Sequence, residues 1–232
     1  MDFEHQHPVS FDNIDEIVDH IHEGDTLAIG GFWFVRIPVA LVESLVRKGV
    51  KNLTVITQAS GLALEQLISA GLVKKVIFSF SSLDIFGLPP SFRRAIENNL
   101  IEWEEWDALR MNQALEAGRQ NLPSMIMQPP FGSDFMKEGE GFAVQKCPLT
   151  GRDLGFVKAI QPDVALIHAQ KADQKGNIQL QGALGIDKLL IGASKQTFAS
   201  VEEVVPEGEF AQDARSTITP HFLINRIVHA PG

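Results

Sequence analysis

Short runs of apolar residues alternate along the chain with segments in which apolar residues recur at helical spacing. The first of these segments, residues 14–21, predicts a helix with Asp12 as its N-cap and Gly24 at its end. The continuous apolar run 26–29 then predicts a short strand that is buried on both faces. The same pairing of one helix with one strand recurs through most of the chain.

Glycine and proline mark the ends of the later elements. Pro38 stands where a first-turn proline begins a helix and Gly49 ends that helix, while Gly71 and Gly118 are expected to end two more. The pattern predicts strands at 53–56, 76–80, 125–127, 164–168, 197–201 and 223–228, and helices at 62–70, 91–98, 107–117 and 187–193. Strands that alternate with helices of about ten residues indicate a parallel sheet with right-handed crossovers.

The segment 128–155 breaks this alternation, because glycine and proline recur through it. We expect it to form a long loop or a small hairpin. The predicted fold class is therefore α/β, with a single open and mainly parallel sheet flanked by helices and an irregular excursion near 128–155. The whole chain, residues 1–232, is predicted to form one domain.

Composition narrows the environment and the partners. Hydrophobic residues make up 44% and charged residues 21%, as in soluble globular proteins. A net charge of −9 argues against binding to nucleic acid or an anionic membrane, and no apolar run approaches the length of a membrane helix. Residues 1–10 lack a signal-peptide pattern, and a single cysteine, Cys147, fits a reducing compartment. We therefore expect a cytoplasmic protein.

The strongest local motif is a glycine pair, Gly30-Gly31, between the predicted strand 26–29 and the helix that begins near Pro38. Open α/β sheets bind ligands at this carboxyl edge, where glycines let a substrate approach and exposed N–H groups attract anions. The spacing lacks the third glycine of a dinucleotide fingerprint, and no Gly-Lys-Ser/Thr follows. A plain turn between strand and helix remains the alternative.

The run from Gly24 to Pro38 resembles the signature of class I coenzyme A transferases, in which a strand leads into Gly-Gly-Phe and a proline follows. Further segments that resemble the family, in the same order, are 48–54, 168–177, 200–205 and 226–232. Arg36 and the surroundings of Ser82 resemble the A subunit of glutaconate CoA-transferase. Ser82-Leu83-Asp84 also resembles the A subunit of a steroid-ring-opening hydrolase of the same fold.

The resemblance implies the fold of the coenzyme A transferases and an enzyme that transfers coenzyme A (CoA) between an acyl-CoA and a carboxylic acid. In this family the catalytic glutamate resides in a B subunit. The resemblance therefore implies a B-type partner, commonly in a heterotetramer, and a chain that is inactive by itself. The CoA thioester is the substrate, and no cofactor is permanently bound.

The A subunit of typical members contributes a polar side chain to the reaction, and this position falls at Ala108. Alanine offers no hydrogen-bond donor, so either Asp107 or Glu105 takes the role, or another donor does, or the chemistry differs. Asp107 is our candidate catalytic residue, although it also suits the N-cap of the following helix.

The other site residues are predicted to bind substrate. Gly30, Gly31 and Arg36 are one set, in which the guanidinium of Arg36 fits a carboxylate; a surface salt bridge is the alternative. Phe32, together with Trp33 and Phe34, is expected to form an apolar wall of a pocket or of a subunit interface.

Ser81, Ser82 and Asp84 follow a predicted strand, so they are predicted either to contact substrate or to cap a turn. His168 is expected to be a hydrogen-bonded histidine of the core. His20 and His22 do not share a helix face, and we expect no metal site.

Three hypotheses follow. The chain is the A subunit of a CoA transferase, the A subunit of a CoA-thioester hydrolase on the same fold, or a noncatalytic partner that completes the site of another subunit. The missing donor at Ala108 leaves the third hypothesis open.

Overall fold

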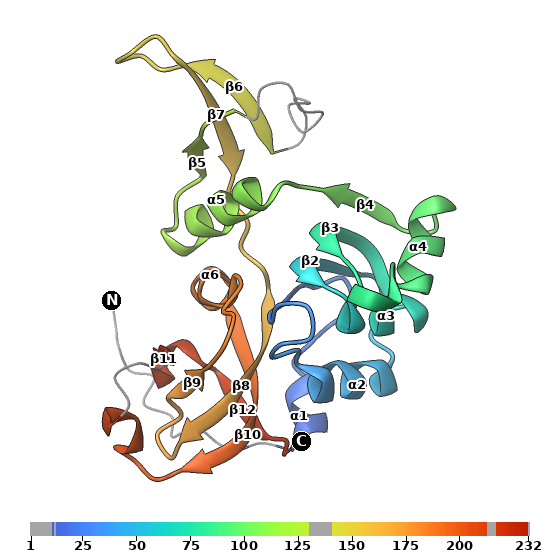
Figure 1. Cartoon of the computed structure of the whole chain (residues 1–232), viewed down its shortest axis with the longest axis vertical. Helices are drawn as coiled ribbons and strands as arrows, with labels where there is room; N and C mark the ends of the chain where they lie inside the picture. Colours follow the sequence, from blue (N-terminus) through green and yellow to red (C-terminus); the bar gives the residue numbers. More distant parts are fainter. Residues whose placement is uncertain (1–10, 12, 130–140, 213–216, 232) are drawn as a thin grey trace.

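In the described part of the chain, seven parallel strands form the main sheet, in the order β12-β10-β8-β1-β2-β3-β4 (Figure 1). The computed structural model describes residues 11, 13–129, 141–212 and 217–231. The strands are β1 (Thr26–Ile29), β2 (Leu53–Ser60), β3 (Val73–Ser81), β4 (Glu102–Glu105), β8 (Val164–Asp173), β10 (Gln196–Val205) and β12 (Arg226–His229). Leu27 of β1 pairs with Val55 on one side and Val164 on the other, so β1 is central.

Helices cover both faces of this sheet. The first face carries α1 (Ile14–Val18), α2 (Val39–Lys48), α3 (Leu62–Ser69) and α4 (Pro90–Glu97), and the second carries α5 (Ala108–Arg119) and α6 (Asp187–Ala193) (Figure 1). Alternate residues of one strand enter different cores: Leu27 and Ile29 pack on the first face and Ala28 on the second. The predicted α/β fold class with a mainly parallel sheet is confirmed.

Two antiparallel additions extend the fold. The far half of β8 pairs with β9 (Ile178–Leu180), which pairs with β11 (Thr217–Thr219). A second sheet, β5 (Ser124–Met127), β6 (Phe142–Lys146) and β7 (Asp153–Lys158), projects beyond α5 (Figure 1). The predicted excursion near 128–155 thus contains a hairpin, while residues 130–140 lie outside the described residues. The strand predicted at 125–127 is present as β5, but it pairs with β7 instead of joining the parallel sheet.

Several predicted boundaries are wrong. The N-cap of α1 is Asn13, whose side chain accepts a hydrogen bond from the N–H of Asp15, and Asp12 lies outside the described residues. This helix ends at Val18, and Gly24, with φ of 86°, belongs to the turn before β1. Gly118 lies inside α5 and not at its end.

Another predicted end is wrong because a turn intervenes. The strand predicted at 223–228 begins only at Arg226, since a 3-10 turn, η4 (His221–Leu223), precedes it. The pattern also missed β4, which is a charged strand at the edge of the sheet. Among the described helices, none combines the length and the apolar character needed to cross a bilayer.

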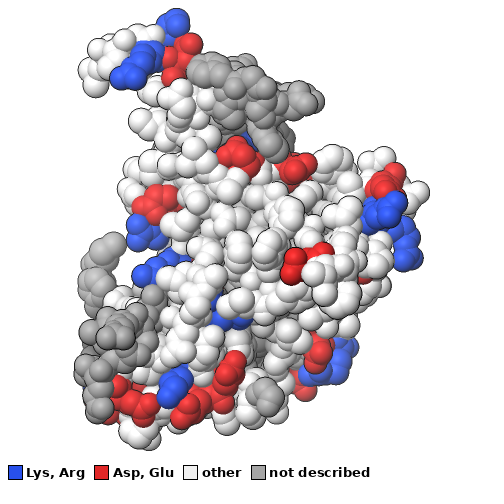
Figure 2. Space-filling model, in the orientation of Figure 1, with Lys and Arg blue, Asp and Glu red and all other residues white. Residues whose placement is uncertain are grey.

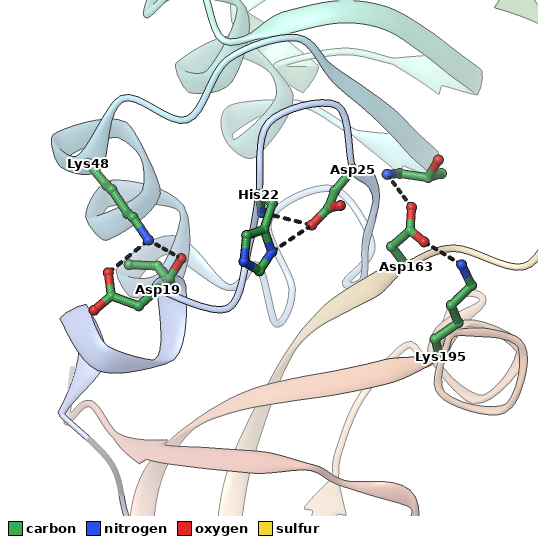
Figure 3. Close-up of polar contacts among 8 residues, drawn as sticks. Asp19, His22, Asp25, Lys48, Asp163 and Lys195 are labelled. Atoms are coloured by element: carbon green, nitrogen blue, oxygen red, sulfur yellow. Dashed lines mark hydrogen bonds and ion pairs between the residues drawn. The ribbon is translucent and has the colours of Figure 1, made fainter.

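Ion pairs hold the amino edge of the sheet (Figure 3). Asp163, just before β8, accepts hydrogen bonds from the N–H of Thr26 at 2.8 Å and from Nζ of Lys195 at 2.7 Å. It therefore ties together the starts of β1, β8 and β10. Nearby, Lys48 of α2 binds the carboxylate of Asp19 at 2.7 Å.

Candidate functional site

The glycine pair after β1 permits a close approach between parts of this chain. A Cβ on Gly30 would lie 2.7 Å from Oδ1 of Asp187 and 2.6 Å from the side chain of Ile167. Gly31 has φ of 85°, and a Cβ there would lie 2.6 Å from the carbonyl oxygen of Arg36. All three distances are shorter than the contacts that a Cβ makes in proteins, so Gly30 lets Asp187 approach the loop and Gly31 lets the loop fold back on Arg36.

Arg36 is buried in an ion pair with Asp187. Its Nη2 donates to Oδ2 of Asp187 at 2.6 Å, and its Nη1 donates to the carbonyl of Gln181 at 2.8 Å. Oδ1 of the same aspartate accepts from the N–H of Gly31 at 2.7 Å, and both charged side chains have no solvent exposure. Burial raises the pKa of Asp187, while the charge and hydrogen bond of Arg36 oppose that rise.

The predicted role of Arg36 is therefore corrected. Its guanidinium already binds a carboxylate of this chain, so it is not placed to bind that of a substrate, and the salt bridge is internal instead of lying on the surface. Sequence reasoning missed Asp187, because nothing in the run 187–193 distinguishes it from the first residue of an ordinary helix.

The aromatic residues after the glycine pair form a tight loop. The N–H of Phe32 donates to the carbonyl of Val35 and the reverse bond closes the loop, both at 2.9 Å. The N–H of Trp33 donates to the carbonyl of Ala59 at the end of β2, and its ring lies 5.8 Å from that of Phe80. Phe32 and Trp33 are half-buried, whereas the side chain that follows them, Phe34, is 49% exposed.

The three residues predicted at the end of β3, Ser81, Ser82 and Asp84, lie in different environments. Ser81 is buried, and its Oγ has no hydrogen-bond partner in the part of the chain that is described. Oγ of Ser82 accepts from the N–H of Asp84 at 2.9 Å, and Asp84 has φ of 56°. The turn-capping alternative thus holds for Ser82, whose hydroxyl lies two residues before the first residue of the 3-10 turn η1 (Asp84–Phe86). Substrate contact by these residues stays a prediction.

Asp107 is the N-cap of α5. Its Oδ1 accepts a hydrogen bond from the N–H of Arg110 at 2.9 Å, as the N-cap alternative predicted. Its Oδ2 is buried without a partner among the residues described. Ala108 and Glu105 are both exposed. A catalytic role for Asp107 stays a prediction.

Two amides that the sequence did not single out meet under α5. Nε2 of Gln58, in β2, donates to Oδ1 of Asn112, in α5, at 2.8 Å, and the pair is half-buried. The two residues are 54 positions apart, so no local pattern reveals them.

Large apolar side chains are exposed around the carboxyl edge. They lie in the loop after β1, near the end of β3 and in the segment that follows β3. We call them the edge patch: Phe34, Val35, Phe80, Ile85, Phe86 and Leu88, which are 41–86% exposed. Charged side chains are sparse over the middle of the face drawn in Figure 2 and lie mostly toward its rim. Several large apolar side chains exposed at one edge of a sheet are typical of a protein-binding or ligand-binding face.

His168 is hydrogen-bonded, as predicted. Its Nδ1 lies 2.9 Å from Oγ of Ser200 and its Nε2 lies 3.1 Å from a carboxylate oxygen of Glu202. These residues belong to β8 and β10. Among the described residues, no cluster of three or more His, Cys, Asp or Glu could hold a metal ion.

Residues 11–230 match the family model described as Coenzyme A transferase. The A subunit of the 3-oxoadipate CoA-transferase of Pseudomonas knackmussii is 33% identical over 215 residues, which are 91% of this chain and 75% of the relative. The cholesterol ring-cleaving hydrolase IpdA subunit of Rhodococcus jostii is 31% identical over 230 residues, 95% of this chain and 77% of the relative. The crystal structure of a variant of the decarboxylase AibA/AibB has a TM-score of 0.88 and 32% identity, covering 97% of this chain and 84% of that chain.

Proposed function

Because this chain belongs to the coenzyme A transferase family, we propose that it is the A subunit of an enzyme that transfers CoA between an acyl-CoA and a carboxylic acid. A relative that is 33% identical is named as the A subunit of a CoA-transferase. The partner is a B-type subunit, and we propose a cytoplasmic heterotetramer that uses the CoA thioester as a substrate and needs no permanently bound cofactor.

The edge patch is the observation that carries this proposal. Six large apolar side chains surround the end of the sheet where the glycine loop lies. Exposure of these side chains to water is unfavourable in an isolated chain, whereas a partner that docks here buries them. The site is then built at the interface between the two subunits.

Two carboxylates of this chain, Asp187 and Asp107, are already engaged in contacts within it, which supports a nucleophile from the partner. Asp187 is held in the buried ion pair, and Asp107 accepts the N-cap hydrogen bond of α5. The partner's carboxylate attacks the thioester carbonyl and releases CoA as a thiolate, giving an acyl anhydride. The thiolate then attacks the carboxyl carbon of that nucleophile, which releases the first acid and leaves a thioester between the partner's carboxyl group and CoA. The acceptor acid attacks this thioester, and the same two steps run in reverse to give the new acyl-CoA and to restore the carboxylate.

A second candidate function is hydrolysis of a CoA thioester or cleavage of its acyl part. The 31% identical IpdA subunit, named as a ring-cleaving hydrolase, favours it, and so does Ser82-Leu83-Asp84. In that case water, and not a second carboxylate, takes part in the reaction.

The test uses the complex of this chain with its proposed B-type partner subunit. A panel of acyl-CoAs is incubated with and without carboxylic acids, and mass spectrometry follows free CoA, new thioesters and loss of CO2. We expect a new thioester only when an acceptor acid is present, and no turnover when the two subunits are assayed separately. Acceptor-independent CoA release or a cleaved acyl chain assigns the hydrolase. A stable complex without turnover leaves the noncatalytic partner.

A further inference from the structure

A cavity of about 380 Å³ lies beside α6, where this helix meets the end of α5 and the segment from β11 to η4 (Figure 1). Two of its lining residues, Ile191 and Thr219, are buried. The lining is completed by Arg119, Lys188, Gly192, Ile218, Pro220 and Leu223. We call this space the α6 cavity, and its volume is typical of a site for a small molecule.

The charge of its lining sets the α6 cavity apart. Four other cavities in the described part of the chain are lined by equal numbers of acidic and basic side chains, for example by Lys74 and Glu102. The α6 cavity is lined by two basic side chains, Arg119 and Lys188, and by no acidic one. In a chain with a net charge of −9, this local excess of positive charge favours an anionic ligand.

One of these two cations is already neutralised within the chain. Nε and Nη2 of Arg119 donate to the two carboxylate oxygens of Glu116, at 2.8 and 2.6 Å. The stem of Arg119 crosses α6 at Gly192, where a Cβ would lie 2.5 Å from Cγ of the arginine. Lys188 has no ion partner within the described residues. The cavity therefore offers one uncompensated positive charge.

The rest of the lining selects an apolar body for the ligand. Ile218 and Leu223 are 41% and 40% exposed, so a ligand that covers them removes apolar surface from water. A carboxylate brings a single negative charge, whereas a phosphate monoester brings nearly two at neutral pH. An aliphatic chain that ends in one carboxylate matches both the apolar walls and the single charge of Lys188.

Helix α6 connects the cavity to the loop after β1. Asp187, the first residue of α6, accepts hydrogen bonds from the N–H of Gly31 at 2.7 Å and from Nη2 of Arg36 at 2.6 Å. Ile191 stands four residues after Asp187, on the same face of the helix, and a side chain at this position leans back over the preceding turn. A ligand that packs on Ile191 therefore steadies the turn that carries Asp187.

We propose that the α6 cavity binds an aliphatic carboxylic acid in its ionised form, with Lys188 as the partner of the carboxylate, and that binding steadies the loop after β1 through α6. Binding is a property of this chain and does not depend on the proposed function. Carboxylic acids are the substrates and products of a CoA transferase, so the use of the cavity as a regulatory site for them rests on that function.

The test titrates the full chain with hexanoate, hexanol and hexylamine and follows binding by NMR. We expect hexanoate to bind more tightly than hexanol, and hexylamine not to bind, because only hexanoate complements the charge of Lys188. Lys188→Gln is expected to weaken hexanoate about five-fold and to leave hexanol unchanged. Lys51→Gln makes the same change of charge at a residue that is not part of the lining, so it is the matched control.

A wall variant and an amide-exchange measurement complete the test. Leu223→Ser is expected to weaken hexanoate and hexanol alike, each about three-fold, since it removes apolar contact and no charge. Saturating hexanoate is expected to slow amide exchange at Gly31 about two-fold in the wild-type chain, as followed by mass spectrometry.

Two results would overturn the carboxylate site: hexanoate that binds no more tightly than hexanol, or equal weakening of hexanoate by Lys188→Gln and Lys51→Gln. Binding of hexanoate without slower exchange at Gly31 refutes the connection through α6. None of these measurements uses turnover. Failure of the site is therefore separable from failure of the proposed function, which is decided by the acyl-CoA assay of the complex.

Discussion

Nη2 of Arg36 and Oδ2 of Asp187 lie 2.6 Å apart, across 151 positions of sequence, in a place that water does not reach. The pair joins the loop after β1 to the start of α6. Asp187 also fixes the N–H of Gly31. The shape of the carboxyl edge therefore depends on a contact between the two halves of the chain.

Removal of one partner of this ion pair is expected to destabilise the fold strongly. Arg36→Met or Asp187→Leu leaves a buried charge without its counter-charge, which costs about 3–5 kcal/mol. The double variant Arg36→Met/Asp187→Leu buries no charge and is expected to be more stable than either single variant. Urea unfolding measures all three free energies, and a double variant as unstable as the sum of the singles contradicts the prediction.

Gly30→Ala is expected to disturb the same contact from the other side. The new Cβ would lie 2.6 Å from the side chain of Ile167 and 2.7 Å from that of Asp187, so both side chains have to move, at about 1–3 kcal/mol. Gly49→Ala is the control: its φ is 74° but nothing lies within 4 Å of the added Cβ. Amide exchange of Gly31, followed by mass spectrometry, should rise in the first variant and stay unchanged in the second.

The edge patch is expected to bind the partner subunit. Phe86→Ser replaces a side chain that is 78% exposed, so the isolated chain should keep its stability within about 0.5 kcal/mol. We expect the Kd of the two-subunit complex to rise at least ten-fold, as for an aromatic anchor of an interface. Phe222→Ser, at a site that is 72% exposed and outside the patch, is the matched control. Equal effects of the two variants, measured by sedimentation, count against a docking role for the patch.

Substitutions at Asp107 separate its two predicted roles. Asp107→Ala removes the N-cap of α5 and is expected to cost about 1 kcal/mol, whereas Asp107→Ser keeps a capping oxygen and should restore most of that loss. Thermal unfolding checks this ranking. Turnover of the well-folded Asp107→Ser complex then decides the catalytic question, because serine caps a helix but has no carboxylate.

Acid is expected to loosen the amino edge of the sheet through Asp163. Burial alone would raise the pKa of this carboxyl, but the hydrogen bonds from Lys195 and from the N–H of Thr26 lower it below its ordinary 3.8. A carboxyl with a lowered pKa in the folded state stabilises the fold above its ordinary pKa. That stabilisation is lost as the pH falls below about 4.

Asp163→Asn should therefore lower the melting temperature at pH 7 and narrow its difference from wild type as the pH falls from 4. Asp153→Asn, which removes the exposed pair with Lys146, is the control and should show little pH dependence. Parallel melting curves of Asp163→Asn and wild type from pH 7 to pH 3 are the outcome that refutes the prediction.

The sequence predicted the buried elements well. The run 26–29 gave β1 with the right ends, and α6 begins and ends where its pattern said, because apolar residues between polar or glycine boundaries identify an element locally. β4 (Glu102–Glu105) was not predicted, because its residues are mostly polar and backbone pairing with β3 holds it in the sheet. β5 was predicted as a strand, but an apolar run does not show which strand it pairs with, which here is β7.

The site was harder to predict than the fold. Arg36 was chosen for its guanidinium, and the structure shows that this group serves Asp187, 151 positions away. Gln58 and Asn112 are unremarkable in sequence and become a pair only when α5 crosses β2. Side-chain chemistry can be read from one segment, but the identity of its partner depends on tertiary contacts.

The central place of β1 also governs how the protein can be made. Its partner β2 follows it closely in the chain, but its other partner, β8, begins only at Val164. During synthesis the nascent chain therefore holds β1 with one edge unpaired until the segment that begins at Val164 has been translated. Such non-local pairing slows folding and exposes strand edges to aggregation. The first half of the chain, produced by itself, should be insoluble, and production of the intact subunit should depend on chaperones that shield that edge.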